Sequence, residues 1–114
     1  MNDCIFCKII AGDIPSNKVY EDDKILCFRD IAPMAPVHLL VIPKVHICSA
    51  DCITEENADV IAHIFTTIPK IAKQEGISED GYRIITNHGT NGRQSVKHLH
   101  FHILAGKLLP ENMG

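Results

Sequence analysis

The chain of 114 residues contains no tryptophan, and aromatic residues make up only 5% of it. Long apolar runs are also lacking, since a stretch such as Leu39–Ile42 falls far short of the roughly 18 residues that a membrane-spanning helix needs. Positive charge is not in excess. The net charge of −3 argues against a binder of nucleic-acid polymers but not against a site for a small anion. The segment Met1–Cys4 lacks the features of an export signal, so we expect a cytoplasmic protein with no membrane partner.

The composition is that of a globular protein, with 46% hydrophobic and 22% charged residues. No repeat, low-complexity tract or linker divides the chain, so we expect residues 1–114 to form a single domain. The five cysteines are an odd number, which favours free thiols or metal ligands over a framework of disulfides.

Hydrophobic periodicity and turn residues predict an α+β fold, with a five-stranded antiparallel sheet and one long and one short helix to one side. The short helix is expected at Ile5–Ile10 with Gly12 after it. The long helix is expected at 55–75, with Thr54 as N-cap and a kink or local break at Pro69. The five expected strands are Lys18–Glu21, Ile25–Arg29, His38–Ile42, Tyr82–Thr86 and Lys97–Leu104.

Three histidines alternate with apolar residues near the end of the chain. Successive side chains of a strand point to opposite faces, so His98, His100 and His102 should share one face while Leu99 and Phe101 pack on the core. The pattern is compatible with a solvated face, a catalytic metal site, or a site for acid–base and nucleophilic work on phosphate. One ion can take two neighbouring rings but not easily all three, because His98 and His102 would lie about 13 Å apart along a strand.

The phosphate interpretation is favoured, with the central His100 as the attacking group. The turn-rich segment 89–95 comes directly before the histidines, and its glycines allow backbone N–H groups to approach an anion closely. Gln94 adds polar hydrogens, and the Ser95 hydroxyl can donate a proton to a leaving group.

The segment 94–104, Gln-Ser-Val-Lys-His-Leu-His-Phe-His-Ile-Leu, resembles the signature of the histidine-triad (HIT) family, in which three histidines alternate with apolar residues. Other segments agree with it in order along the chain: Ile5–Ile10, Ile14-Pro15, Tyr20–Asp23, Phe28–Pro33, Ala35–His38, Val41–Lys44, Gly81–Arg83 and Asn87. The resemblance covers nearly the whole chain. It is strongest to the nucleotide-binding branch whose members act as purine nucleoside phosphoramidases.

The resemblance implies a role for each matching residue. His100 would attack the α-phosphorus of a nucleoside phosphoramidate and form a transient nucleotidyl-histidine, which water then hydrolyses. His102 and His38 would assist at the phosphate, His98 would support them from the start of the strand, and Asp30 would bind the ribose hydroxyls. The purine slot would be Phe6, Ile9, Ile14, Phe28 and Ile31, and the contacts to phosphate or leaving group would be Asn87, Gln94 and Ser95. The family also implies a homodimer with joined sheets, and no organic cofactor.

Some positions depart from the family pattern. Arg93 stands where glycine is usual, and Ala105-Gly106-Lys107 replaces a common Gly-Gly-Arg. A positive φ at Arg93 would cost about 1 kcal/mol or more, although its guanidinium can pair with phosphate. The tail that follows is short.

The pair Cys4 and Cys7 has the spacing of half a zinc site, which His46 and His98 can complete. Some bacterial members of the family with this Cys-x-x-Cys bind zinc through such a set. Zinc therefore stands as a structural metal beside two alternatives, a redox pair and two uncoordinated thiols. We interpret Cys48 and Cys52 as ordinary thiols.

Two other functions are compatible with the same residues. One is a nucleotide-binding regulatory module with vestigial activity, which the departure at Arg93 and the short tail favour. The other is a dinucleoside polyphosphate hydrolase or nucleotidyl transferase. Ser95 favours the phosphoramidase, because a hydroxyl there can protonate an amine leaving group.

Overall fold

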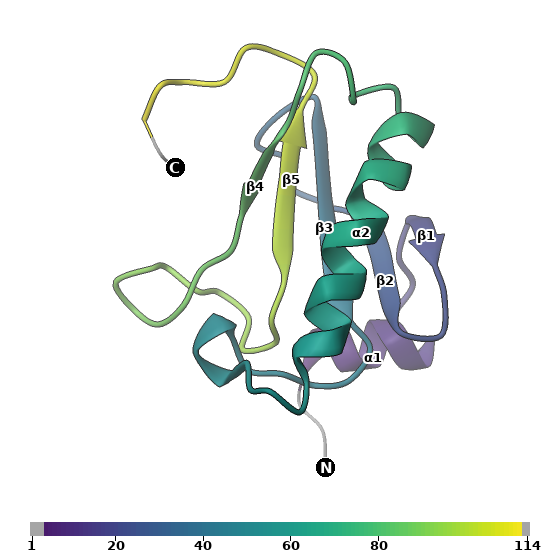
Figure 1. The fold of residues 1–114 in the computed structure, drawn as a ribbon, viewed down its shortest axis with the longest axis vertical. Helices are drawn as coiled ribbons and strands as arrows, with labels where there is room; N and C mark the ends of the chain where they lie inside the picture. The colour runs from purple at the N-terminus through teal and green to yellow at the C-terminus, as the bar shows by residue number, and fades with distance from the viewer. Residues whose placement is uncertain (1–3, 113–114) are drawn as a thin grey trace.

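A computed structural model describes residues 4–112 (Figure 1). It contains a five-stranded sheet in the order β1-β2-β3-β5-β4, with every neighbouring pair antiparallel. The strands are β1 (Lys18–Glu21), β2 (Ile25–Arg29), β3 (Val37–Pro43), β4 (Arg83–Ile85) and β5 (Phe101–Ala105). The helices are α1 (Ile5–Ala11), α2 (Ala58–Gln74) and the 3₁₀ turn η1 (Ala50–Cys52). The predicted α+β class and antiparallel sheet are confirmed.

The two α-helices lie on opposite faces of the sheet (Figure 1). The prediction that both lie on one side is therefore wrong. The alternation along β2 shows this, because Ile25 and Cys27 belong to the apolar core under α2 while Leu26 and Phe28 pack with Phe6 of α1. β2 and β3 are buried along nearly their whole length, as expected of strands covered on both faces.

The long helix α2 begins later than predicted. Its N-cap is Asn57, and Thr54 instead lies in the preceding turn, where its N–H donates to the Asn57 side chain at 2.7 Å. Pro69 does not break the helix, which is continuous from Ala58 to Gln74. Pro69 and Phe65, whose carbonyl loses a donor, are both exposed, so water can replace the missing hydrogen bond. The short helix α1 does end as expected, with Gly12 at φ 85°.

The last strand is shorter than predicted at its beginning. β5 pairs with β3 only from Phe101 to Ala105, opposite Val41 to Val37. Before Phe101 the chain bends away from the sheet, and the Leu99 N–H donates to the Ile47 carbonyl at 2.6 Å. The alternation of faces nevertheless persists, because Leu99, Phe101 and Ile103 all belong to the core under α2.

Within residues 4–112, no helix has the length and apolar character that a bilayer crossing would require.

Asp22 connects the β1–β2 turn to α2. Its carboxylate accepts hydrogen bonds from the backbone N–H groups of Lys24 and Ile25, and from His63 Nε2 of α2 at 2.7 Å. Partial burial acts to raise the pKa of Asp22, but the hydrogen bonds from His63 and the turn hold it well below its usual range. The ionised carboxylate therefore stabilises the folded state above about pH 4, and this contribution is lost as the pH falls.

We expect Asp22→Ala to lower the free energy of unfolding by about 1–3 kcal/mol at pH 7, because it removes a charged acceptor from several donors. The difference from the unmodified chain should shrink at pH 3. The exposed neighbour Asp23 provides the control, and Asp23→Ala should change stability by less than about 0.5 kcal/mol. Urea denaturation at both pH values measures this, and equal losses for the two variants would contradict the assigned role.

Candidate active site

Three histidines meet on the face of the sheet that α1 partly covers. His38 lies on β3 and His102 on the adjacent β5, and their rings are joined by a contact of 2.9 Å between His38 Nε2 and His102 Nδ1. His100 comes just before β5, with its ring centroid 5.1 Å from that of His102. His38 and His100 are buried at 6% and 3% exposure, while His102 is half-buried. The alternating pattern therefore does bring His100 and His102 together, and β3 adds His38.

Hydrogen bonding determines the tautomers of His38 and His102. The Met34 backbone N–H donates to His38 Nδ1 at 3.0 Å, so the proton of a neutral His38 lies on Nε2. This Nε2–H faces His102 Nδ1, which must accept, and the proton of His102 is then on its own Nε2. The result is a relay of donors that ends at the His102 Nε2–H, for which no acceptor occurs among residues 4–112.

His100 is oriented by its own backbone. Its Nδ1 lies 2.7 Å from the His98 carbonyl oxygen. A carbonyl oxygen can only accept, so His100 Nδ1 carries the proton and the lone pair of the neutral ring is on Nε2. The edge of the ring packs against Phe6 of α1, with centroids 5.1 Å apart. The nucleophilic nitrogen is thus defined by one hydrogen bond and one packing contact.

Burial keeps these rings neutral. It lowers the pKa of His38 and of His100 below the ordinary value, and it lowers the pKa of His102 to about 4. Asp30 opposes this effect on all three, but its charge does not outweigh the desolvation. At neutral pH the site therefore holds one free imidazole nucleophile and a neutral N–H donor beside it.

Asp30 lies at the edge of this group. One of its carboxylate oxygens is 3.4 Å from His38 Nε2, and the other accepts the Ala32 N–H at 2.8 Å. The ligand atoms of Asp30, His38 and His102 lie within 4.8 Å of one another, as in a metal site. The facing nitrogens of the two histidines are already hydrogen-bonded to each other, however, so their donor set serves the relay rather than an ion.

The residues of the predicted purine slot differ in their burial. Phe6, Ile9 and Phe28 are buried together in the apolar cluster between α1 and the sheet, with Ile14 half-buried beside them. Ile31 is fully exposed in the loop that follows β2.

The loop between β4 and the histidines is held by side chains of its own. Asn87 Nδ2 donates to the Gly92 carbonyl at 2.7 Å, and Gln94 Oε1 accepts the Gly89 N–H at 3.2 Å. Gln94 Nε2 also donates to the carbonyls of Cys48 and Val96. The amide side chains of Asn87 and Gln94 thus shape the loop, whereas Ser95 is exposed.

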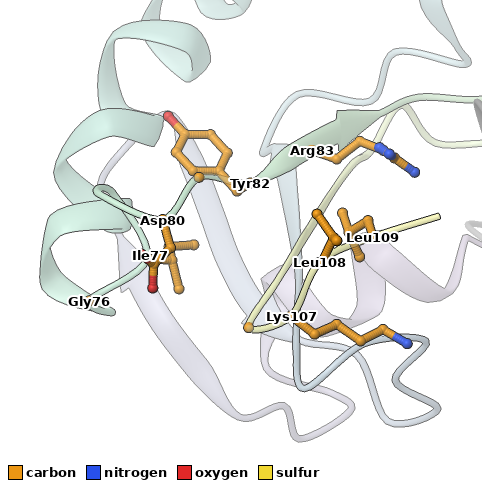
Figure 2. Close-up of a pocket in the computed structure, with 10 residues that line it drawn as sticks. Gly76, Ile77, Asp80, Tyr82, Arg83, Lys107, Leu108 and Leu109 are labelled. Atoms are coloured by element: carbon orange, nitrogen blue, oxygen red, sulfur yellow. The ribbon is translucent and has the colours of Figure 1, made fainter. Parts of the chain in front are cut away.

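A cavity of about 350 Å³ opens beside the histidines and is bordered by the C-terminal tail. Its lining includes His38, His102, Asn87, Leu109 and Pro110. The Arg83 guanidinium fastens the tail by donating to the carbonyls of Pro110 and Asn112 at 2.7 and 3.2 Å. A larger cavity of about 610 Å³ adjoins it and shares Arg83, Lys107 and Leu109 in its wall. It lies between the end of α2 and the tail, with Tyr82 and Ile77 on one side and Lys107–Leu109 on the other (Figure 2).

No sequence pattern assigns a role in the site to Met34 or Arg83. The Met34 contribution is a backbone N–H, which any residue except proline supplies, so no side-chain pattern could reveal it. Arg83 acts through carbonyls of the tail 27 and 29 residues further along, again without a pairing signal in the sequence.

A second cluster contains Cys4, Cys7, His46 and His98, whose ligand atoms all lie within 4.8 Å of one another. His98 Nδ1 is 3.3 Å from Cys4 Sγ and 3.5 Å from Cys7 Sγ, and His46 Nδ1 is 3.4 Å from Cys7 Sγ. Tetrahedral zinc with bonds of about 2.3 Å to sulfur and 2.0–2.1 Å to nitrogen separates its ligand atoms by about 3.5 Å. The four residues therefore fit a zinc ion.

His98 belongs to this cluster by the orientation of its ring. Its Nε2–H donates to the Pro43 carbonyl at 2.8 Å, which leaves the unprotonated Nδ1 facing the two sulfurs. Such a second hydrogen bond is usual for a metal-binding histidine. The backbone carbonyl of His98, in turn, accepts the Nδ1–H of His100.

Comparison with known proteins relates the whole chain to one family. A protein family described as "Scavenger mRNA decapping enzyme C-term binding" matches residues 3–113. The chain is 47% identical to the purine nucleoside phosphoramidase of Escherichia coli K12 over 105 residues, which cover 92% of this chain and 88% of that protein. It is 48% identical over 111 residues to a 14 kDa zinc-binding protein of Brassica juncea, covering 92% and 94%. The structure of a histidine triad protein from Clostridium difficile superposes with a TM-score of 0.95 at 54% identity, covering 98% and 97%.

Arg93 has a φ of 59°, in the left-handed region that favours glycine. We expect Arg93→Gly to be more stable than Arg93→Ala by about 1 kcal/mol, because only glycine adopts this conformation without a Cβ clash. Thermal or urea unfolding of the two variants measures the difference. An alanine variant as stable as the glycine variant would show that the backbone at this position carries no strain.

Proposed function

Because the chain belongs to the histidine-triad (HIT) family of nucleotide-binding hydrolases, we propose that it hydrolyses the P–N bond of purine nucleoside phosphoramidates through a nucleotidyl-histidine at His100. The observation that carries the proposal is the 2.7 Å contact of His100 Nδ1 with the His98 carbonyl, which leaves Nε2 as a neutral nucleophile. The E. coli relative named for this activity supports the choice of substrate.

In the first step His100 Nε2 attacks the α-phosphorus, the P–N bond breaks and the amine departs with a proton. In this proposal the exposed Ser95 hydroxyl donates that proton to the amine. The His102 Nε2–H, at the free end of the relay from Met34 and His38, hydrogen-bonds a phosphoryl oxygen. In the second step water attacks phosphorus and gives up a proton that restores the Ser95 hydroxyl, the bond to His100 breaks and the nucleoside monophosphate leaves.

The other expected residues bind the rest of the nucleotide. Asp30, next to His38, accepts hydrogen bonds from the ribose hydroxyls. Asn87 and Gln94 hold the loop against the phosphate, and the purine lies over the apolar cluster of Phe6, Ile9 and Phe28 with Ile14 and Ile31 at its border.

Zinc at Cys4, Cys7, His46 and His98 would be structural. It would tie the first turn of α1, where Cys4 is the N-cap, to the segment after β3 and to the residue that orients His100. The B. juncea relative named as a zinc-binding protein supports this assignment.

We also propose that two copies of the chain form a homodimer in the cytoplasm. β4 has three residues and is an edge strand. Because it lies at the edge, the backbone groups on its outer side face away from the sheet and are available for a second copy. Leu108, in the wall of the larger cavity, is 98% exposed and would be covered by a second copy of the chain (Figure 2).

We expect His100→Ala to lower the turnover of adenosine phosphoramidate by about 10³-fold or more, because the nucleophile is removed. His63→Ala is the matched control, since His63 lies on α2 on the other face of the sheet, and its turnover should be unchanged. Release of adenosine monophosphate measures both. A diadenosine polyphosphate assayed in parallel distinguishes the phosphoramidase from the polyphosphate hydrolase, and full turnover by His100→Ala would refute the covalent mechanism.

Protein purified without chelators should contain about one zinc ion per chain by elemental analysis, since structural zinc is held tightly. Cys7→Ala should lose the metal and melt at a lower temperature, whereas Cys27→Ala, in the core and outside the cluster, should retain it. A content below about 0.2 zinc per chain in the unmodified protein would contradict the site.

Light scattering after size exclusion should give about twice the chain mass of 12.6 kDa. The reason is that joining the β4 edges pairs their outer backbone groups and covers exposed apolar side chains. A mass of one chain at every concentration tested would contradict the homodimer.

A further inference from the structure

His88 takes no part in the proposed chemistry, although it lies close to the residues that do. It follows Asn87 in the loop of residues 87–96, which runs from β4 toward His100. Asn87 lines the cavity beside the active-site histidines, whereas the ring of His88 lies against Ser49, with Nδ1 2.7 Å from Ser49 Oγ. Ser49 is the N-cap of η1, in the segment that follows β3, so this contact ties the loop to a separate part of the fold.

The surroundings of Ser49 determine the direction of this hydrogen bond. Ser49 is 2% exposed, and its Oγ accepts the Asp51 backbone N–H at 3.2 Å. Among residues 4–112, His88 Nδ1 is the one acceptor in contact with the Ser49 hydroxyl. The hydroxyl therefore donates to the lone pair of Nδ1, and the proton of a neutral His88 lies on Nε2. A buried hydroxyl that loses its acceptor is costly, so position 88 has to supply one.

The side chain of Asp51 adds little to this arrangement. Its Oδ2 lies 3.9 Å from His88 Nε2, which is beyond hydrogen-bonding distance, and the side chain is 78% exposed. The contact that holds the ring of His88 is therefore the one with Ser49.

The backbone of the loop connects His88 to the amide side chains beside it. A Cβ atom at Gly92 would lie 2.4 Å from the His88 carbonyl oxygen, so the two backbones pack directly on each other. The Gly92 carbonyl also accepts Asn87 Nδ2 at 2.7 Å. At the other end of the loop, Gln94 Nε2 donates to the Cys48 carbonyl at 2.7 Å. The loop is thus fastened to the segment after β3 at two places, by Gln94 and by His88.

We propose that His88 is a positioning residue: by accepting the Ser49 hydroxyl it fixes the loop in the shape that binds phosphate, and so sets the affinity for the nucleotide. This inference rests on the proposed function, in which the amides of Asn87 and Gln94 hold the loop against the phosphate.

The nucleophile does not depend on this contact. His100 is oriented by the His98 carbonyl at 2.7 Å and by packing against Phe6. Loss of the His88 contact therefore weakens the binding of substrate and transition state alike, which raises KM and leaves kcat nearly unchanged.

Hydrogen exchange and calorimetry test the contact without reference to turnover. In His88→Leu, which has no acceptor, amide exchange over residues 87–96 should be at least about twofold faster, with exchange in β2 and β3 unchanged. The affinity for adenosine monophosphate should fall about fivefold, the equivalent of one hydrogen bond. His88→Asn, whose Oδ1 can accept in place of Nδ1, should restore both values. Asp51→Asn is the matched control and should change neither.

A second substitution separates the hydrogen bond from a general loss of packing. Ser49→Ala removes the donor, so His88→Leu in that background should have no further effect on loop exchange or on affinity. Additive effects of the two substitutions would overturn the proposal, as would a His88→Asn variant as impaired as His88→Leu. Unchanged exchange and affinity in His88→Leu would overturn it outright.

Turnover of adenosine phosphoramidate distinguishes this proposal from the one on which it rests. His88→Leu should raise KM about fivefold and change kcat by less than about twofold. A lower kcat at unchanged KM would overturn the positioning role. Absence of turnover in the unmodified chain would refute the phosphoramidase instead, and loop exchange and nucleotide affinity would still decide the role of His88.

Discussion

The hydrogen bond between His100 Nδ1–H and the His98 carbonyl oxygen determines what the site can do. Because a carbonyl oxygen accepts and never donates, the 2.7 Å contact places the proton on Nδ1 and the lone pair on Nε2. Burial then keeps the ring neutral, since it lowers the pKa of His100. Without this bond the ring would be free to present either nitrogen to the phosphate.

The position of His98 therefore matters for the proposed chemistry, although its ring points away from His100 and toward the cysteines. Its Nε2–H is held by the Pro43 carbonyl and its Nδ1 faces the two sulfurs of Cys4 and Cys7. His98 thus links the cysteine cluster to the nucleophile, because its ring faces the sulfurs while its carbonyl oxygen accepts the His100 Nδ1–H. On the other side, His102 is oriented by His38, whose tautomer depends on the Met34 N–H.

Sequence patterns predicted the sheet well where strands pair along their whole length. The hairpin of Lys18–Glu21 and Ile25–Arg29 was predicted to the residue, because the polar turn and the apolar runs beside it indicate the same strand ends. The last strand was not, since periodicity continues through His98 while the chain leaves the sheet before Phe101 to bond Ile47. Alternation of side chains describes extended backbone, and it does not show where a partner strand ends.

The candidate site shows the same limit. The residues that carry chemistry have distinctive side chains, and the alternation of the histidines predicted that His100 and His102 share one face. The resemblance alone pointed to His38. The Cys-x-x-Cys spacing predicted the cysteine cluster, with His46 and His98 as its candidate partners. Contributions made by backbone atoms, such as the Met34 N–H and the Pro43 carbonyl, are the same for nearly every residue type and leave no pattern to read. The placement of the two helices on opposite faces also depended on long-range packing, which local periodicity does not contain.

The most direct test of a covalent role for His100 is the mass of the enzyme itself. The protein is mixed with adenosine phosphoramidate and quenched in the steady state under conditions that preserve phosphohistidine, and the intact chain and its peptides are weighed. A covalent role for His100 predicts a fraction of chains heavier by one adenylyl group, with that group on His100 and on no other histidine. An adenylyl group on another residue, or turnover at full rate with no modified chain at any quench time, would contradict it.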